Sequence, residues 1–576
     1  MKKIYLSAAA LLSFAFMNAQ TAFFTGTTYK GAFPITDGST GVASNDWTSG
    51  WAEWDPENKV YPVPTSTLTG DISTNTSISG VVYLNGFVHV KNNAILTIAP
   101  GTIIRCDKVV PSAPSCLIIT KGSKIMAQGT ALQPIVFTSN EDDLVNVGRF
   151  PGDWAGIIIL GNGVINTGGV SQNPNVSKVE GFLTVDPLRY YGGNNDADNS
   201  GVMSHVRIEF AGISLDPATP NSEINGLTMG GIGSGTQLNH IQVSFSGDDS
   251  FEWFGGKVDA KWLIANRGTD DDFDTDFGYR GRIQFGLGIK DADISDISLT
   301  TGASNGFESD NSDPINLRFP ITKVVFSNMT MIGAKRDVST VMPVGEKHEC
   351  AVHLRRNTGQ TIVNSLFLGF EKGLRIQNSV TFDNYNAPAT FADSMGIFSN
   401  NSITSDVALT YVTDNAAGFT IPWYHGYSAA NSVDTTMTIS QIDFANYAIP
   451  VASISDYRLK ATSSATTGAN FSGPAFAGQV TGIKNVSQSV VNEFVLYPNP
   501  ATANTNISFT ITEKNKVSVN VYDVLGNLVS ILSQNNDFEK GKNTISLNTS
   551  SLSSGVYYIS LDINGTKETK TLIINK

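Results

Sequence analysis

The sequence predicts an all-β protein in which a parallel β-helix precedes a small C-terminal β-sandwich. One pattern, Leu-x-Ile-x-x-Gly-x-x-Ile, occurs over residues 96–104 and again over 117–125. Self-similarity with a period of about 21 residues is typical of repeat architectures such as the β-helix. Short β-branched runs separated by Gly, Asn, Asp and Ser continue from 81 to 460, as expected for strands joined by turns. From 492 onward, apolar and polar residues alternate along short segments, which favours a separate sandwich.

Each copy of the repeat describes a strand, a bend and a second strand. Leu96 and Ile98 lie two residues apart and therefore share one face of a strand. Gly101 marks the bend, because glycine adopts positive φ without steric cost. One such unit in every ~21 residues predicts one coil of a β-helix. A large β-sandwich or propeller is the alternative, and the regular spacing favours the β-helix.

The chain divides into five segments. It begins with Met1-Lys2-Lys3, continues with a short apolar run and reaches small residues near Ala19. This is the pattern of a secretory signal peptide, and the run is too short to span a bilayer. The predicted boundaries are a signal peptide at 1–19, a lead-in and cap at 20–80, the β-helix at 81–460, a linker at 461–491 and a C-terminal domain at 492–576.

The composition narrows the class of protein. The 576 residues carry a formal net charge of −13, which argues against nucleic-acid binding, since that function needs a basic surface. An acidic chain is compatible with bound cations. Beyond the leader, no stretch approaches the ~18 uncharged apolar residues of a membrane span, so we expect no transmembrane segment in the mature protein. The chain has three cysteines, too few for a disulfide scaffold.

Three tryptophans stand among acidic residues in the lead-in: Trp47, Trp51 and Trp54. One interpretation is a surface on which sugar rings stack. The other, which we favour, is an aromatic plug over the first coil, because solenoids need capped ends.

Four motifs follow one another in the C-terminal domain. They are Tyr497-Pro498-Asn499-Pro500, the segment 522–529 with Gly526, the segment 553–558 with Gly555, and the segment 570–576 with Lys576. Together they resemble the type A sorting domain of the type IX secretion system. The resemblance implies export through the inner and outer membranes of a Gram-negative bacterium, with the secretion machinery as partner. It also implies removal of the domain, after which the mature part is attached to surface lipopolysaccharide or released. We therefore expect a secreted or outer-membrane-surface protein.

The body looks like the secreted right-handed β-helix proteins that occur beside such sorting domains. The residues that carry this resemblance are 96–104, 117–129, 134–139 and 152–156. The resemblance implies a fold and carries over no site. Such β-helices include pectate lyases, which use Ca²⁺ with a basic residue, and polygalacturonases, which use paired carboxylates. Gly247-Asp248-Asp249 resembles the Gly-Asp-Asp of polygalacturonases, but the nearest match to their Asn-Thr-Asp follows it in the wrong order, at 274–276.

An acidic series recurs at intervals of about one coil. Asp248, Asp249 and Glu252 come first, and acidic residues follow within 270–276, 291–296 and 308–313. Neighbouring coils lie ~4.8 Å apart, so stacked carboxylates repel by ~1 kcal/mol in water and several-fold more where water is excluded. Such a column needs cations, raised carboxyl pKa values or basic partners. The basic candidates near in sequence are Arg267, Arg280, Arg282 and Lys290.

The run 270–276 is the centre of a candidate metal site. In an extended strand its alternate residues point to one side, which brings together Asp270, Asp272, Asp274 and Asp276. Carboxylates in this number suit Ca²⁺, which takes six to eight oxygens. Together with Asp248 and Asp249, they are the predicted metal ligands. The alternative is a solvated or arginine-paired acidic turn.

These observations lead to three hypotheses of function. The first is a non-catalytic surface protein that binds a glycan or another surface polymer, because the solenoid face is long and no intact catalytic motif is present. The second is a polysaccharide lyase or glycoside hydrolase that acts through Asp248, Asp249 and the carboxylates of 270–276. The third is a structural surface-layer component.

Overall fold

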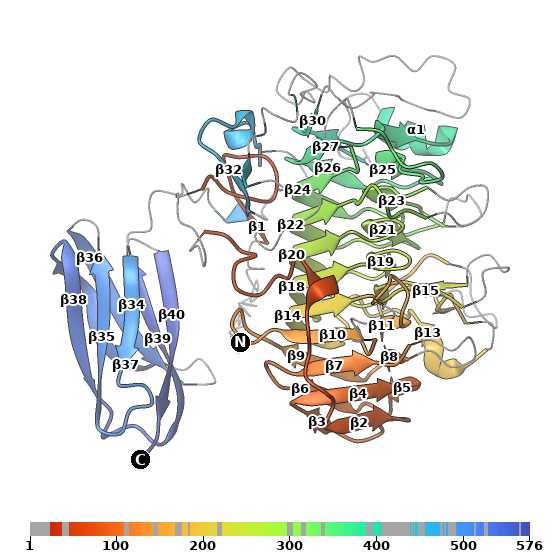
Figure 1. The fold of residues 1–576 in the computed structure, drawn as a ribbon. Coiled ribbons are helices and arrows are strands. Elements are labelled where there is room, and N and C mark those ends of the chain that lie inside the picture. The colour runs from red at the N-terminus through yellow and green to blue at the C-terminus, as the bar shows by residue number, and fades with distance from the viewer. Residues whose placement is uncertain are drawn as a thin grey trace, which may run out of the picture. The chain divides into compact units, whose positions relative to one another are not determined.

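The computed structural model describes residues 23–576 except 37–44, 109–114, 142–147, 168–174, 183–184, 216–221, 297–302, 313–317, 336–339, 387–395, 405–437, 439–441, 443, 447–455, 473–475, 477–479, 482–490, 512–513, 524–527 and 564–565. The predicted signal peptide, 1–19, lies outside the described residues. The chain divides into two compact units, Met1–Ile483 and Lys484–Lys576 (Figure 1). Among the described residues, no helix is long and apolar enough to cross a membrane.

The first unit is a parallel β-helix, as the sequence predicted. Its larger sheet contains β2 (Ser66–Thr69), β4 (Val81–Asn85), β7 (Ile103–Cys106), β10 (Ile135–Ser139), β14 (Gly201–Glu209), β18 (Gln237–Ser244), β20 (Asp259–Asn266), β22 (Arg282–Ile289), β24 (Val325–Ile332), β26 (Thr361–Val363) and β29 (Phe398–Ser399). To this sheet also belong β3 (Thr76–Ile78), β6 (Ile95–Ile98), β9 (Lys124–Gln128), β27 (Leu366–Leu368) and β30 (Ser402–Ile403). The helix therefore begins at β2, inside the predicted lead-in.

A nine-stranded sheet closes the coils on the other side. It contains β5 (Phe87–Val90), β8 (Cys116–Ile119), β11 (Gly156–Leu160), β17 (Leu227–Gly230), β19 (Phe251–Phe254), β21 (Phe273–Asp276), β23 (Phe307–Ser309), β25 (Cys350–Leu354) and β28 (Lys372–Ile376). The short helix α1 (Ser379–Asn386) follows β28.

The larger sheet folds into two faces along one column of residues. Strand β14 pairs with β9 through 201–204 and with β10 through 206–208. His205 stands between the two halves with a φ of 51°, a left-handed conformation that is uncommon outside glycine. His240, Trp262 and Phe285 adopt it in the following coils. With the nine-stranded sheet, the helix thus has three faces: the first contains β3, β6 and β9, the second β4, β7 and β10, and the third the nine-stranded sheet.

The sequence repeat marks a corner of the helix and not a full coil. One copy runs from β6 through Gly101 to β7, and the other from β8 through Gly122 to β9. Both glycines have positive φ, 75° and 85°, which explains their recurrence. Strand β6 pairs with β9, whereas β8 pairs with β5. The two copies therefore lie on different faces, and the expectation that they are equivalent positions of adjacent coils is wrong.

The length of a coil varies because loops are inserted at the corners. Phe251 pairs with Phe273, 22 residues further on. Ile283 pairs with Phe326, 43 residues further on. A period near 21 residues consequently describes only the coils without insertions.

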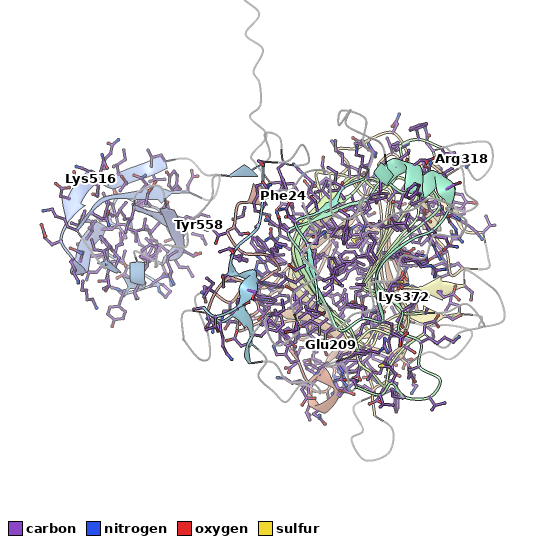
Figure 2. The ribbon with its side chains drawn as sticks, turned by 90° about the horizontal axis from the view of Figure 1, so that it is seen from above. Phe24, Glu209, Arg318, Lys372, Lys516 and Tyr558 are labelled. Atoms are coloured by element: carbon purple, nitrogen blue, oxygen red, sulfur yellow. The ribbon has the colours of Figure 1, made fainter. Side chains whose placement is uncertain are left out.

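Aromatic rings stack inside the helix, where side chains fill the interior (Figure 2). Phe251, Phe273 and Phe307 occupy the same inward position of β19, β21 and β23. Their ring centroids lie 5.5 and 5.4 Å apart, and all three side chains are fully buried. Parallel register thus produces a continuous apolar ladder, the main source of stability in a solenoid.

Residues 23–36 and 45–61, here called the N-terminal strap, lie along the second face and reach the first face at Thr25. The backbone of Thr25 exchanges hydrogen bonds with the side-chain amide of Gln284, at 2.8 and 2.7 Å. Trp51 packs edge-on against His205 and His240 at centroid distances of 5.8 and 5.7 Å. Its side chain is only 1% exposed, so it offers no surface for sugar stacking. The expected plug over the first coil is also wrong, because Trp51 contacts β14 and β18.

Described residues between 461 and 481, within the predicted linker 461–491, contact the strap. Strand β1 (Phe24–Thr25) pairs with β33 (Val480–Thr481), and the Lys30 amide donates to the Ala465 carbonyl at 2.9 Å. Ala465 is fully buried. Small residues are common here because they fit between the strap and the sheet, and the first unit therefore extends to Ile483.

The second unit has two antiparallel sheets around one core, as the sequence predicted. One sheet contains β34 (Val491–Tyr497), β35 (Asn504–Ile511) and β38 (Gly541–Asn548). The other contains β37 (Leu528–Phe538), β36 (Asn515–Tyr522), β39 (Gly555–Ile563) and β40 (Thr566–Ile574). Side chains from both sheets form a single buried cluster.

We expect Phe307→Ala to destabilise the first unit by about 3–5 kcal/mol, because it removes a buried ring from the ladder and leaves a cavity. Urea unfolding followed by tryptophan fluorescence measures the loss selectively, since no tryptophan lies in the second unit. Leu132→Ala is the control, because Leu132 is 84% exposed. Equal unfolding midpoints for the two variants would contradict the ladder as a source of stability.

Candidate functional site

Consecutive coils place polar side chains in one column on the outer surface of the third face. Parallel register aligns Glu252 of β19 with Asp274 of β21, and Asp274 with Glu308 of β23. The column continues with His353 of β25 and Arg375 of β28. The residues on either side of Asp274 in sequence are fully buried. Alternation along the strand therefore directs the carboxylate outward.

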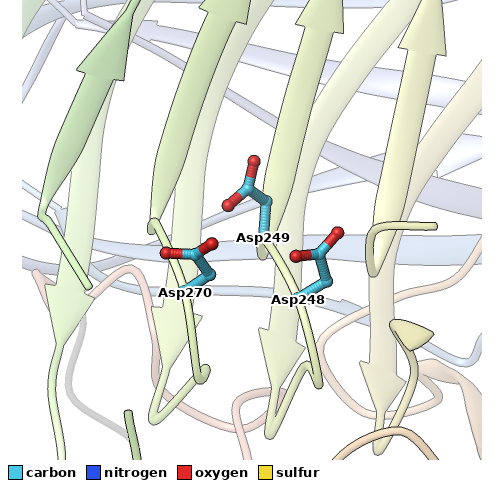
Figure 3. A group of neighbouring side chains, drawn as sticks. All are labelled: Asp248, Asp249 and Asp270. Atoms are coloured by element: carbon cyan, nitrogen blue, oxygen red, sulfur yellow. The ribbon is translucent and has the colours of Figure 1, made fainter. Parts of the chain in front are cut away.

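The turns before β19 and β21 add further carboxylates. Asp248 and Asp249 precede β19, and Asp270 lies on the neighbouring coil (Figure 3). One carboxylate oxygen from each of these three residues lies within 4.8 Å of the other two. Asp249, Glu252 and Asp274 form a second group within the same distance. Asp249 belongs to both groups and therefore joins the turn to the column.

The carboxylates of the second group are largely withdrawn from solvent. Asp249 is 7% and Glu252 is 5% exposed. Asp249 Oδ1 accepts a hydrogen bond from the Asp271 amide at 2.9 Å, and Glu252 Oε2 accepts one from Asn225 Nδ2. Asp274 Oδ1 is buried and has no hydrogen-bond partner among the described residues.

Burial and mutual repulsion raise the pKa values of this cluster. Burial is the larger cause for Asp249, and the charge of Asp248 adds to it. Burial likewise raises the pKa of Asp274, with a contribution from Glu308. No ion pair joins Asp249, Glu252 or Asp274 to a basic residue in the described part of the chain. At neutral pH the cluster therefore either retains protons or needs a cation.

Glu180 extends the acidic cluster. Burial raises its pKa to about 7, and it hydrogen-bonds Glu252. Burial is also the largest cause of the raised pKa of Glu252, followed by the charge of Glu180. A carboxyl pair in contact favours sharing one proton, since two like charges at this distance repel strongly.

From β23 onward, the acidic residues of the column form ion pairs with basic residues. Arg355 Nε lies 2.8 Å from Asp310 Oδ1, and Arg356 Nη1 lies 2.7 Å from Asp310 Oδ2. His353 Nδ1 lies 3.3 Å from Glu308 Oε2. Burial opposes ionisation of Glu308, but Arg355 and His353 outweigh it and lower its pKa to about 2. Glu308 and Asp310 thus have basic partners, although burial still raises the pKa of Asp310, whereas Glu252 and Asp274 have no ion pair in the described chain.

The structure brings together four of the six predicted metal-binding residues: Asp248, Asp249, Asp270 and Asp274. Asp272 departs from the expected side. It is fully buried, and its Oδ1 lies 3.1 Å from Lys290 Nζ. Because β21 begins only at Phe273, the alternation that aligned Asp272 with Asp274 does not apply. Asp276 belongs to neither group of three, and its Oδ1 accepts from the Phe277 amide.

Three of the four predicted basic partners have ion pairs elsewhere. Arg267 binds Asp291 at 2.6 Å, which removes Asp291 from the acidic series. Arg280 binds Asp196 at 2.9 Å, and Arg282 binds Asp259. We assigned these arginines to the acidic series because they are near it in sequence. Arg267 instead follows β20, and Arg280 and Arg282 lie just before and at the start of β22, away from the acidic column.

Several residues of the site were not found from the sequence: Glu180, Asn225, His353, Arg355 and Arg356. Glu308 and His353 occupy adjacent coils but are 45 residues apart, about twice the expected spacing. The sequence of Cys350–Leu354 contained a signal for His353. Val352 and Leu354 are apolar and point inward, so the alternation of a strand directs His353 outward.

The four sorting motifs lie close together in the second unit, in the parts that the structure describes. Asn499 Nδ2 donates to the Thr571 carbonyl at 2.7 Å, and the Ile573 amide donates to Asn499 Oδ1 at 2.8 Å. Lys576 Nζ donates to the Ser550 carbonyl at 2.8 Å. Pro498 and Pro500 flank Asn499, and Gly555 begins β39. Gly526 lies outside the described residues.

Comparison with known families identifies both units. A model described as a pectate-lyase-like β-helix domain matches residues 70–445. The chain belongs to this family. The secretion system C-terminal sorting domain matches residues 495–575. The protein is thus a secreted or cell-surface β-helix protein of a Gram-negative bacterium, sorted by the type IX system. No curated protein matches the chain.

We expect Asp274→Asn to stabilise the cation-free protein more at pH 8 than at pH 5. The folded state raises the Asp274 pKa above its ordinary value of 3.8, so stability is lost as the pH rises through the folded-state pKa. An amide cannot ionise and avoids about 1 kcal/mol or more of repulsion at pH 8. Urea unfolding at both pH values, with a chelator present, measures the difference.

Asp71→Asn is the matched control for this experiment. A hydrogen bond from Lys91 is the largest cause of the lowered pKa of Asp71. Its substitution should therefore lower stability slightly at both pH values. An equal effect of Asp274→Asn at pH 5 and pH 8 would show that Asp274 carries no unusual repulsion.

Proposed function

We propose that the outer surface of β19, β21, β23, β25 and β28 binds a glycan or another surface polymer without cleaving it. In this proposal a divalent cation, most suitably Ca²⁺, is held by Asp249, Glu252 and Asp274. The observation that carries the proposal is the convergence of three carboxylates within 4.8 Å, none of which forms an ion pair with a basic residue in the described chain.

The donor atoms fit a hard cation. All are oxygens, the ligand type that Ca²⁺ prefers, and Ca²⁺ accepts irregular sets of six to eight. Asp274 Oδ1 has no hydrogen-bond partner in the part of the chain that the structure describes. Asn225, which touches Glu252, is 1% exposed, and its amide oxygen also lacks a partner within the described residues. A bound cation would compensate the repulsion and present its remaining coordination positions to sugar oxygens.

The other surfaces of the helix are less suitable for a polymer. The N-terminal strap covers parts of the first and second faces, as the contacts of Thr25 with Gln284 and of Glu53 with Gln242 show. On the third face, Phe182 and Tyr191 pack over Ile158 and Leu160 of β11 in one apolar cluster. From β19 onward the outer surface instead carries charged groups.

Arginines at the β25 and β28 end of the third face provide the second half of the proposed binding surface. The side chains of Arg355, Arg356 and Arg375 are 25%, 31% and 20% exposed. Each side chain stays partly exposed while it pairs with a carboxylate. Arginine donates planar pairs of hydrogen bonds to carboxylates and hydroxyls. A polymer that crosses from β19 to β28 would therefore meet a cation first and arginines next.

Retention of the full-length protein on immobilised acidic and neutral polysaccharides tests this function. We expect retention of at least one polymer in Ca²⁺ and its loss in chelator. The double variant Glu252→Gln/Asp274→Asn should bind about ten-fold more weakly, which corresponds to 1.4 kcal/mol. The control is Glu371→Gln, an exposed carboxylate that pairs with Lys335. Unchanged retention of the double variant would contradict the proposed site.

A second candidate function, cleavage of a polysaccharide, is favoured by two carboxyls that titrate near neutral pH. Burial raises the pKa of Glu180 to about 7 and that of Asp271 to about 8. Such groups suit general acid–base catalysis. New reducing ends or unsaturated products that disappear in Asp271→Asn would establish an enzyme and overturn the binding-only proposal. We expect no such products.

A further inference from the structure

The second unit exposes apolar side chains that its core does not use. Sixteen apolar residues form its buried cluster. Yet eight of the seventeen large apolar residues that are exposed in the described chain lie in Lys484–Lys576. They are Val495, Tyr497, Leu528, Val529, Ile531, Val556, Tyr558 and Ile573.

Most of these side chains share the outer surface of one sheet. Register aligns Leu528 with Tyr522, and Tyr522 with Tyr558. It also aligns Val556 with Ile573. Val521, Ile559 and Leu572, which adjoin Tyr522, Tyr558 and Ile573 in sequence, are buried, so strand alternation directs these three aromatic and apolar side chains away from the core. Leu528, Ile531 and Val556 are themselves 51%, 50% and 39% exposed. We call Tyr522, Leu528, Ile531, Val556, Tyr558 and Ile573 the apolar patch.

The apolar patch occupies only one end of the sheet. Further along the same outer surface, Ser518 aligns with Asp562. Lys516 also lies at this polar end, whereas Tyr558 belongs to the patch (both are labelled in Figure 2). A local patch with a polar surround is typical of a protein-binding surface.

Five of the six residues of the patch, all except Ile531, come from the sorting motifs. The segments 522–529, 553–558 and 570–576 each contribute to it. The remaining motif is joined to it, because Asn499 exchanges hydrogen bonds with Thr571 and Ile573. Segments distant in sequence thus meet at one surface, although their outward side chains add nothing to the core.

We propose that the apolar patch is the surface through which the type IX secretion machinery binds this chain, by an apolar surface of its own. The matched sorting domain identifies the machinery as the occupant, since the patch is built from the residues that define that domain. Tyr522 and Tyr558 are suited to the centre of such an interface, where tyrosines are enriched. The inference is independent of polymer binding by the first unit.

Export of the full-length chain in a bacterium with a type IX system tests the proposal. In Val556→Thr/Tyr558→Thr/Ile573→Thr, the outward side chains become polar while β propensity is kept. We expect the ratio of surface plus medium protein to periplasmic protein to fall at least ten-fold. The conservative variant Tyr558→Phe/Ile573→Val should be exported like the natural chain. So should the polar-end control Ser518→Thr/Ser560→Thr.

Photo-crosslinking in the cell provides a test that does not depend on folding of the triple variant. A benzophenone side chain at position 558 should form an adduct with an outer-membrane component of the secretion system, detected with an antibody to that component. An adduct only with a second copy of the chain, or only within the chain, would overturn the proposal. Export of the triple variant at the natural level would overturn it as well.

Discussion

The strict parallel register of the coils is the constraint on which the rest of the structure depends. Each residue of a strand lies one strand spacing, ~4.8 Å, from its equivalent on the next coil. Inside the helix this spacing stacks Phe251, Phe273 and Phe307 and stabilises the fold. Outside, the same spacing stacks Glu252 and Asp274, where it is unfavourable. The fold that gains from repetition in its core therefore concentrates charge on its surface.

The concentrated negative charge is neutralised by arginines at one end of the acidic column and is left without ion pairs at the other. Arg355 and Arg356 neutralise Glu308 and Asp310, and the Glu308 pKa falls to about 2. Burial, followed by repulsion from neighbouring carboxylates, raises the pKa values of Asp249 and Asp274, and neither residue has an ion pair in the described chain. Groups held together against repulsion are characteristic of binding sites. The uncompensated end is for this reason the better candidate for function.

The fold was predictable because its signals are local. β-Branched runs and turn residues predicted strands, and period-two alternation predicted the sandwich. The register between coils was not predictable from the repeat. Gly101 and Gly122 each mark a bend between two strands, but they lie at different corners of the helix, so their spacing does not measure one coil. The column of left-handed residues at His205 and His240 left no recognisable signal, since its residue types vary.

The candidate site was predictable in part. The acidic series and its stacking followed from spacing, because β19 and β21 are separated by a coil without insertions. The position of Asp272 against Lys290 depends on where β21 begins, and strand ends are set by packing that sequence alone does not reveal. Arg355 and Asn225 join the site across inserted loops, whose length hides the register. The strap depends on contacts between residues far apart in sequence, such as Thr25 and Gln284.

Titration calorimetry of the full-length protein with Ca²⁺ near pH 7 tests the central claim most directly, namely that the uncompensated carboxylates hold a cation. Since burial raises the pKa values of these groups, binding should displace protons from them, and the measured heat should change with the ionisation enthalpy of the buffer. The account predicts a saturable, buffer-dependent heat that is lost in Glu252→Gln/Asp274→Asn. Absence of a saturable heat in the natural chain, or an identical heat in the double variant, would contradict it.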